Sequence, residues 1–228
     1  MHEVSFDRLD ADGALAEAAE RAGVVSRGAF LAGALGSSAA VVGLAATPAA
    51  AQSGGPGARD VSILNYALTL EYLQAAFYTE AERMKALRGR AAEAAQVVGA
   101  VERAHVKAFR DVLGNKAVAR PSFDFQGTTE NQNAFLKTAV AFEDLAVEAY
   151  KGQAPRLQAN SALAAALSIH SVEARHAAWM RYLFGVEPAT RAFDQPRSKQ
   201  QITRVVNSTN FITSTPSTQR NRTPRYTG

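Results

Sequence analysis

Two stretches of this 228-residue chain repeat each other, and the repeat constrains the fold more than any other feature. In the first stretch, Glu71 is followed seven residues later by Tyr78, and in the second, Glu143 is followed at the same distance by Tyr150. Seven residues are two turns of a helix, so each pair lies on one helix face. Taken singly, these residues are typical of surface acids and core aromatics, but their repetition indicates a shared role.

Each stretch is followed by a second repeated motif, a glutamate and a histidine three residues apart. Glu102 precedes His105, and Glu173 precedes His176. Residues at this spacing emerge side by side from one face of a helix. A single glutamate–histidine pair of this kind is more often an exposed polar pair than a pair of metal ligands. Two pairs, each placed after a Glu–Tyr segment, predict a common site.

The four motifs together match the ligand pattern of a binuclear metal centre in a helix bundle. Such a centre takes one glutamate from each of two helices and a Glu-x-x-His motif from each of the other two. The predicted ligands are Glu71, Glu102, His105, Glu143, Glu173 and His176. Four carboxylates balance two divalent ions, whereas without metal they would repel one another and raise each other's pKa. The chain has no cysteine, so thiolate ligands are excluded.

Several neighbouring residues are weaker candidates. His170 lies six residues before His176 and is expected to point elsewhere. Glu148 lies about 140° around the helix from Glu143, and Asp144 is a weaker rival beside it. Tyr78 and Tyr150 are expected to lie just behind the ligands or to serve as core aromatics. No catalytic residue is assigned.

Apolar residues recur at intervals of three and four between residues 60 and 188, which predicts an all-α fold. The predicted helices run from about 61 to 87, from 90 to 113, from after Thr129 to about Tyr150, and from after Asn160 to Phe184. Thr129 is the expected N-cap of the third helix, and Gly114 the expected end of the second. Hydrophobic residues make up 47% of the chain, enough for a sizeable core.

The lengths of the connections predict the topology. Short loops join the first helix to the second and the third to the fourth, so each pair forms an antiparallel hairpin. The middle connection, residues 115–128, could span about 45 Å when extended, while a helix of this length measures about 36 Å. We expect a four-helix bundle of two hairpins joined by a long crossover.

The N-terminal part of the chain is typical of an export signal. Residues 29–47 carry no charge, and three alanines at 49–51 suit a signal peptidase. The segment 26–31 resembles a twin-arginine signal, except that Gly28 occupies the place of the second arginine. Three outcomes stay open: twin-arginine export, the general secretory route, or a retained membrane anchor. The expected location is the periplasm, the cell envelope or the exterior.

These observations predict four segments. Residues 1–51 are the export signal, 52–59 a flexible joint, 60–190 the bundle, and 191–228 a mostly irregular or disordered tail. An apolar patch in the tail, made by Ile202, Val205, Val206, Phe211 and Ile212, could form a short helix or strand that docks on the bundle. The net charge of +4 owes much to this tail, but its basic residues are not clustered, so no nucleic-acid partner is expected.

With these motifs, residues 60–193 resemble the ferritin-like superfamily, and look closest to the bacterial ferritin-like domain group related to desiccation-related proteins. The resemblance implies that the six predicted ligands bind two iron ions, or alternatively two manganese ions. It also implies iron storage, ferrous oxidation, peroxide reduction or oxygenation as possible activities. The expected function is an exported protein with a dinuclear iron centre, redox-active towards oxygen or peroxide.

Two alternatives stay open, a manganese-catalase-like enzyme and a non-catalytic stress or envelope protein with a structural or vestigial metal site. The expected partners are metal ions and oxygen or peroxide, with membrane contact only through an uncleaved signal. The oligomeric state is left open.

Overall fold

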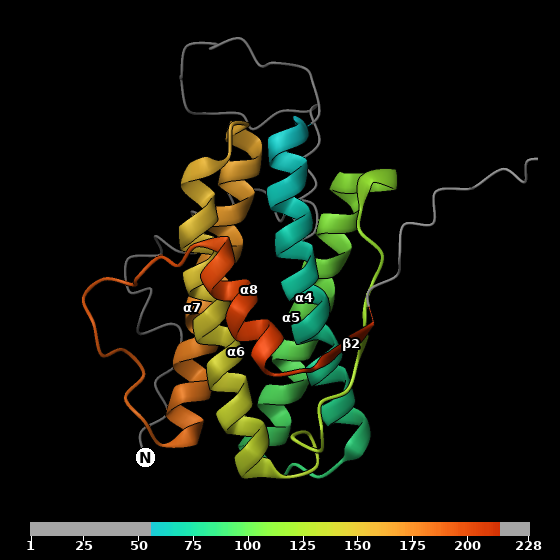
Figure 1. Cartoon of the computed structure of the whole chain (residues 1–228). Helices are drawn as coiled ribbons and strands as arrows, with labels where there is room; N and C mark the ends of the chain where they lie inside the picture. The colour runs from blue at the N-terminus through green and yellow to red at the C-terminus, as the bar shows by residue number, and fades with distance from the viewer. Residues whose placement is uncertain (1–55, 215–228) are drawn as a thin grey trace, which may run out of the picture.

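A computed structural model describes residues 56–214 of the protein, and four long helices dominate it. They are α4 (Ala58–Met84), α5 (Gly89–Leu113), α6 (Gln132–Gln153) and α7 (Asn160–Phe184). Figure 1 shows the four helices packed side by side along one direction. Helix α4 packs closely against α5, and α6 against α7, as two antiparallel hairpins. The predicted all-α bundle is therefore confirmed.

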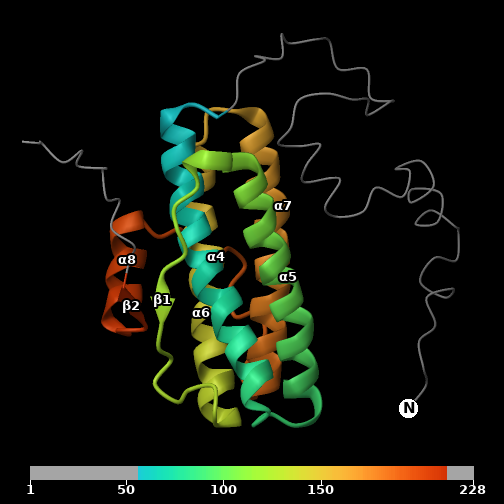
Figure 2. The same ribbon diagram turned by 90° about the vertical axis from the view of Figure 1, so that its right-hand side faces the viewer.

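The connection between the hairpins runs along the whole length of the bundle (Figure 2). It begins with the short 3₁₀ helix η1 (Gly114–Lys116) and includes the short strand β1 (Ser122–Phe123). The Asn65 side chain holds its first part against α4, donating to the carbonyl of Lys116 at 2.8 Å and accepting from the Val118 amide at 2.7 Å. The buried ring of Phe125 anchors its second part.

The N-cap of helix α6 lies two residues later than predicted. The N-cap is Asn131, whose side chain accepts hydrogen bonds from the amides of Asn133 and Ala134, both at 3.0 Å. Thr129, the expected cap, is instead fully buried, and its hydroxyl donates to Glu80 at 2.8 Å. The correction has a local cause, because turns at 125–130 precede the helix and keep Thr129 outside it.

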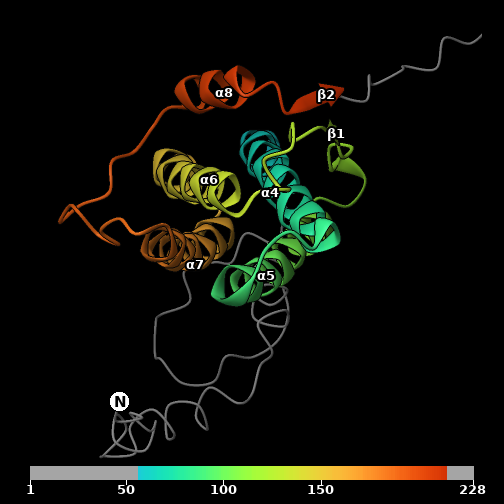
Figure 3. The same cartoon turned by 90° about the horizontal axis from the view of Figure 1, so that it is seen from below.

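The tail up to residue 214 is more regular than predicted. It contains α8 (Lys199–Ser208) and strand β2 (Ile212–Ser214), which pairs antiparallel with β1. Figure 3 shows α8 and β2 on the outer side of α6 and α4. Ile202, Val206 and Phe211 are buried there, so the apolar patch does dock on the bundle, while Val205 is exposed. A capping box formed by Ser198 and Gln201 starts α8.

The predicted export signal and the last residues of the tail lie outside the described residues, so the signal stays a prediction. Within residues 56–214, no helix has both the length and the apolar character needed to cross a membrane. The short 3₁₀ helix η2 (Ala154–Arg156) completes the described elements by joining α6 to α7.

The buried apolar side chains form two clusters. One is rich in aromatic rings and contains Phe77 and Phe135, and the other contains Leu64 and Phe109. On α5 and α7, the predicted ligands lie between residues of the two clusters; on α5, Glu102 and His105 lie between Val98 and Phe109. The bundle therefore encloses a polar layer in the middle of an apolar core.

Candidate metal centre

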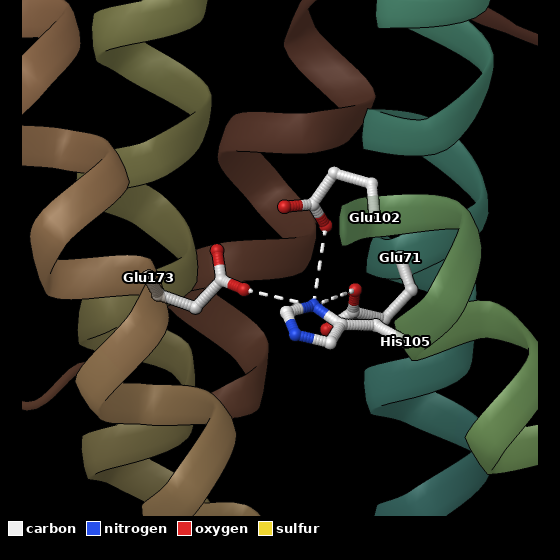
Figure 4. Close-up of side chains that lie close together, drawn as sticks. All are labelled: Glu71, Glu102, His105 and Glu173. Carbon is white, nitrogen blue, oxygen red and sulfur yellow. Dashed lines mark ion pairs between the residues drawn. The ribbon is translucent and has the colours of Figure 1, made fainter. Parts of the chain in front are cut away.

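All six predicted ligands point into this polar layer. The four glutamates are fully buried, and His105 and His176 are 4% and 6% exposed. Helix α4 contributes Glu71, α5 contributes Glu102 and His105, α6 contributes Glu143, and α7 contributes Glu173 and His176. Figure 4 shows three of the carboxylates arranged around the imidazole of His105. Buried charges at this density require partners of opposite charge.

The side chains divide into two groups that could each hold a metal ion. The first is Glu71, Glu102, His105 and Glu173, and the second is Glu102, Glu143, Glu173 and His176. Within each group, one potential ligand atom per residue lies within 4.8 Å of the others. Glu102 and Glu173 belong to both groups, which gives them a shared position between the two. This sharing was not predicted; both residues come from the Glu-x-x-His motifs.

The Nδ1 atom of each histidine faces the carboxylates. His105 Nδ1 lies 3.2 Å from Glu71 Oε2, 3.2 Å from Glu173 Oε1 and 3.6 Å from Glu102 Oε2. His176 Nδ1 lies 3.0 Å from Glu102 Oε1 and 3.5 Å from Glu143 Oε2. Nitrogen and oxygen atoms thus converge on two nearby points, each with one imidazole.

The two tyrosines connect the hairpins in a crossed pattern. The hydroxyl of Tyr78 donates to Glu143 Oε1, and the hydroxyl of Tyr150 donates to Glu71 Oε1. Each tyrosine therefore contacts the glutamate of the other hairpin rather than the one on its own helix. Antiparallel packing of α4 and α6 produces the crossing, because two turns along either helix lead to the glutamate of the other.

The remaining ligand atoms fit a cation site. The following atoms are buried and have no hydrogen-bond partner among the described residues: Glu71 Oε2, both oxygens of Glu102, Glu143 Oε2, both oxygens of Glu173, and Nδ1 of His105 and His176. An unsatisfied buried polar group costs about 1–3 kcal/mol, and more if it is charged. Carboxylate oxygens and imidazole nitrogens together suit first-row divalent metals. The donor set therefore fits metal binding.

Burial and mutual repulsion change the proton affinity of the shared carboxyls. Burial raises the pKa of Glu102 to about 7, and the charge of Glu71 contributes to the rise. Burial, with the charge of Glu102, likewise holds the pKa of Glu173 well above its ordinary value. The same environment raises the pKa of Tyr78 and Tyr150 well above 10, so both hydroxyls keep their protons and donate.

For the two histidines, burial and the neighbouring carboxylates act on the pKa in opposite directions. Burial acts to lower the pKa of His176, but its contacts with Glu102 and Glu143 outweigh burial and raise that pKa to about 10. The pKa of His105 is also raised, mainly by the charge of Glu71 against the effect of burial. Burial acts to raise the pKa of Glu71, yet the charge of His105 leaves it lowered. Metal binding at this cluster must therefore displace protons.

The weaker candidates belong to neither group. Asp144 forms an ion pair with Arg181 at 2.5 Å, and Glu148 forms one with Arg197 at 2.9 Å. His170 is half-buried on α7, and burial lowers its pKa. Of the three acidic residues Glu143, Asp144 and Glu148 on α6, only Glu143 lies in one of the two groups.

Comparison with known families gives one match. A model of the ferritin-like domain family matches residues 59–186, a range that includes nearly all of α4, all of α5 and α6, and all of α7. A search of curated proteins found no match. All six residues of the cluster lie inside the matched range.

Proposed function

Since the chain belongs to the ferritin-like domain family, we propose that it binds a dinuclear iron centre that is redox-active towards oxygen or peroxide. The observation that carries the proposal is the pair of ligand groups that share Glu102 and Glu173. Shared carboxylates suit two adjacent cations, because each carboxylate has two oxygens. Glu71 with His105 would complete one position, and Glu143 with His176 the other.

The charge and the chemistry of the donors support two divalent ions. Four carboxylates offset the four positive charges of two such ions, which would remove the repulsion that raises the pKa of Glu102 and Glu173. Imidazole suits iron, as it does zinc, copper and nickel, and carboxylates suit manganese. Two iron ions are therefore the main proposal, and two manganese ions the alternative.

Two bound ferrous ions would supply two electrons, one from each ion, which with two protons reduce dioxygen to hydrogen peroxide or hydrogen peroxide to two waters. The protein's own residues would prepare the site for this reaction. Tyr78 and Tyr150 hold Glu143 and Glu71 by hydrogen bonds and fix the orientation of their free oxygens. The buried position of the cluster limits access of bulk water.

A second candidate function is a structural metal site without catalysis. The observation in its favour is that the cluster draws ligands from all four long helices. A metal ion bound by several helices stabilises the fold, because the unfolded chain lacks the assembled site. In that case the metal would be present but would not react with oxygen or peroxide.

The first experiment measures the metal content of the full-length protein by mass spectrometry after purification from its native host. About two iron ions per chain are expected in the wild type, and background iron in a Glu102→Ala, His176→Ala double variant. A Glu148→Gln variant serves as the matched control, since Glu148 lies on α6 and pairs with Arg197 outside the cluster. It should retain the wild-type metal content.

Oxidation of the loaded protein then separates the two candidate functions. Anaerobic ferrous protein is mixed with dioxygen or hydrogen peroxide, and the ferric absorbance is followed. Rapid oxidation that needs Glu102 and His176 supports the redox proposal. Bound iron that oxidises no faster than free iron favours the structural role, and absence of metal after anaerobic loading rejects both.

A further inference from the structure

A cavity of about 30 Å³ lies at the end of the bundle where α4 and α7 begin and α5 and α6 end. All four long helices contribute to its lining, which contains no charged side chain. The polar side chains in the lining are Tyr66, Tyr150 and Gln153, and all the other lining residues are apolar. The cavity is separate from the six ligands, and the proposed function does not use it.

One tyrosine connects the cavity to the six-residue cluster. Tyr150 lines it and donates its hydrogen bond to Glu71. Two other lining residues, Phe109 and Ile169, lie four residues from His105 and Glu173, about one helical turn away. A molecule in the cavity would therefore lie beside the half of the centre that Glu71 and His105 form.

The internal repeat shows why this end of the bundle is hollow. When Glu71 is aligned with Glu143 and Tyr78 with Tyr150, Phe77 corresponds to Ala149. At the opposite end, Phe77 is fully buried within the aromatic cluster. Its counterpart Ala149 has only a methyl group and lines the cavity.

The same relation holds at other positions. In the same alignment Phe142 corresponds to Leu70, and the rings of Phe142 and Phe77 lie 5.1 Å apart in the aromatic cluster. When His105 is aligned with His176, Trp179 corresponds to Ala108. Trp179 packs against the aromatic cluster, whereas Leu70 and Ala108 line the cavity. At these three positions, the cavity is lined by smaller side chains where the other hairpin has aromatic rings.

The volume of the cavity and the side chains that line it determine which kind of molecule it can bind. About 10–15 Å³ accommodates one water-sized sphere, so this cavity has room for a molecule of two or three heavy atoms. A buried water needs two to four polar partners, whereas mainly apolar walls favour an apolar guest. We propose that the cavity binds a small apolar molecule next to the Glu71 half of the centre. The identification of this molecule as dioxygen rests on the proposed function.

Xenon is the probe that tests the cavity without any metal chemistry, because it is a small apolar atom that enters dry cavities. The full-length protein is titrated with dissolved xenon, and the ¹²⁹Xe chemical shift is followed. A saturable shift is expected for the wild type. It should disappear in Ala149→Phe and Ala108→Trp, which copy the residues of the opposite end.

An Ala100→Phe variant adds a large side chain at an exposed position of α5 and should keep the wild-type shift. Circular dichroism checks that each variant is folded, and Ala108→Trp, at a half-buried position, keeps the test available if Ala149→Phe does not fold. A wild type without a saturable shift overturns the proposal. So does a shift that survives in the folded variants.

Oxidation of ferrous protein distinguishes this proposal from the proposed function. If the cavity delivers dioxygen, the filled variants lose rate with dioxygen more than with hydrogen peroxide. Xenon binding in a protein that oxidises no iron would retain the cavity and reject the redox function. Iron oxidation in a protein that binds no xenon would support the redox function and reject the proposal for the cavity.

Discussion

At the scale of single residues, the four buried glutamates have two different environments. Glu71 and Glu143 each accept a hydrogen bond from a tyrosine, whereas among residues 56–214 Glu102 and Glu173 accept none and have only the imidazoles of His105 and His176 as ion-pair partners. The first pair is held in place by the protein, and the second pair is free to contact cations on two sides. This difference supports the proposal that Glu102 and Glu173 would be shared by two cations, and that Glu71 and Glu143 would each serve one.

Removing one tyrosine hydroxyl tests this assignment. In Tyr150→Phe, Glu71 loses the donor that orients it, and divalent metal affinity should fall about 10–100-fold, as it does when the groups behind a ligand are removed. The measurement is an anaerobic titration with ferrous or manganous ion. Tyr182→Phe, at an exposed tyrosine on α7, should bind metal like the wild type. Equal affinity in Tyr150→Phe would show that the hydroxyl does not orient the ligand.

At the scale of helices, one contact joins the start of α4 to the start of α7. Ala159, at the N-cap position of α7, has no side chain that could cap the helix. The buried carboxylate of Asp60 lies opposite, and its two oxygens accept hydrogen bonds from the amides of Gln158 and Ala159 at 3.0 and 2.9 Å. A residue from the first hairpin thus satisfies amides at the turn of the second.

The Asp60→Ala substitution should be costly for this reason. Two amides would lose their acceptor, and the free energy of unfolding should fall by about 2–4 kcal/mol. Urea unfolding followed by circular dichroism gives the value. Asp111→Ala removes an exposed acid that pairs with Lys107, so it should change stability by less than about 1 kcal/mol. Similar losses in the two variants would contradict the role of Asp60.

At the scale of the whole molecule, the polar layer links folding to metal binding and to pH. Without metal, the pKa of Glu102 is raised from 4.5 to about 7, and that of His176 from 6.5 to about 10. A group whose pKa is higher in the folded state stabilises the fold at low pH and loses that contribution as the pH rises through its folded value. The stability that these two groups give the metal-free protein therefore falls as the pH rises, from about 4.5 to 7 for Glu102 and from about 6.5 to 10 for His176.

Metal removal should consequently matter more at higher pH. Bound cations would take the place of the protons on these side chains, so the metal-loaded protein would avoid this loss. The difference in melting temperature between loaded and chelator-treated protein should be larger at about pH 8 than at about pH 5.5. Scanning calorimetry at both pH values measures it. A difference that shrinks as the pH rises would contradict the argument, and the Glu102→Ala, His176→Ala variant should show none at either pH.

The sequence by itself determined the helices, the two hairpins, the long crossover and the six residues that converge. Helical periodicity is a local property, so the spacing of Glu102 and His105 places them on a common face of any helix that contains them. The length of residues 115–128 allowed the connection to cross the whole length of the bundle. Thr129 was misjudged as the helix cap because turns and caps use the same residue types.

Only the tertiary structure decided which side chains meet across the bundle. The contact from Tyr78 to Glu143 joins residues 65 apart in sequence, and that from Tyr150 to Glu71 joins residues 79 apart. Their pairing depends on how far α4 and α6 slide and rotate against each other, which no local spacing encodes. The docking of α8 and the cavity beside Ala149 have the same origin, since packing between distant segments decides which surfaces are covered and which volumes stay empty.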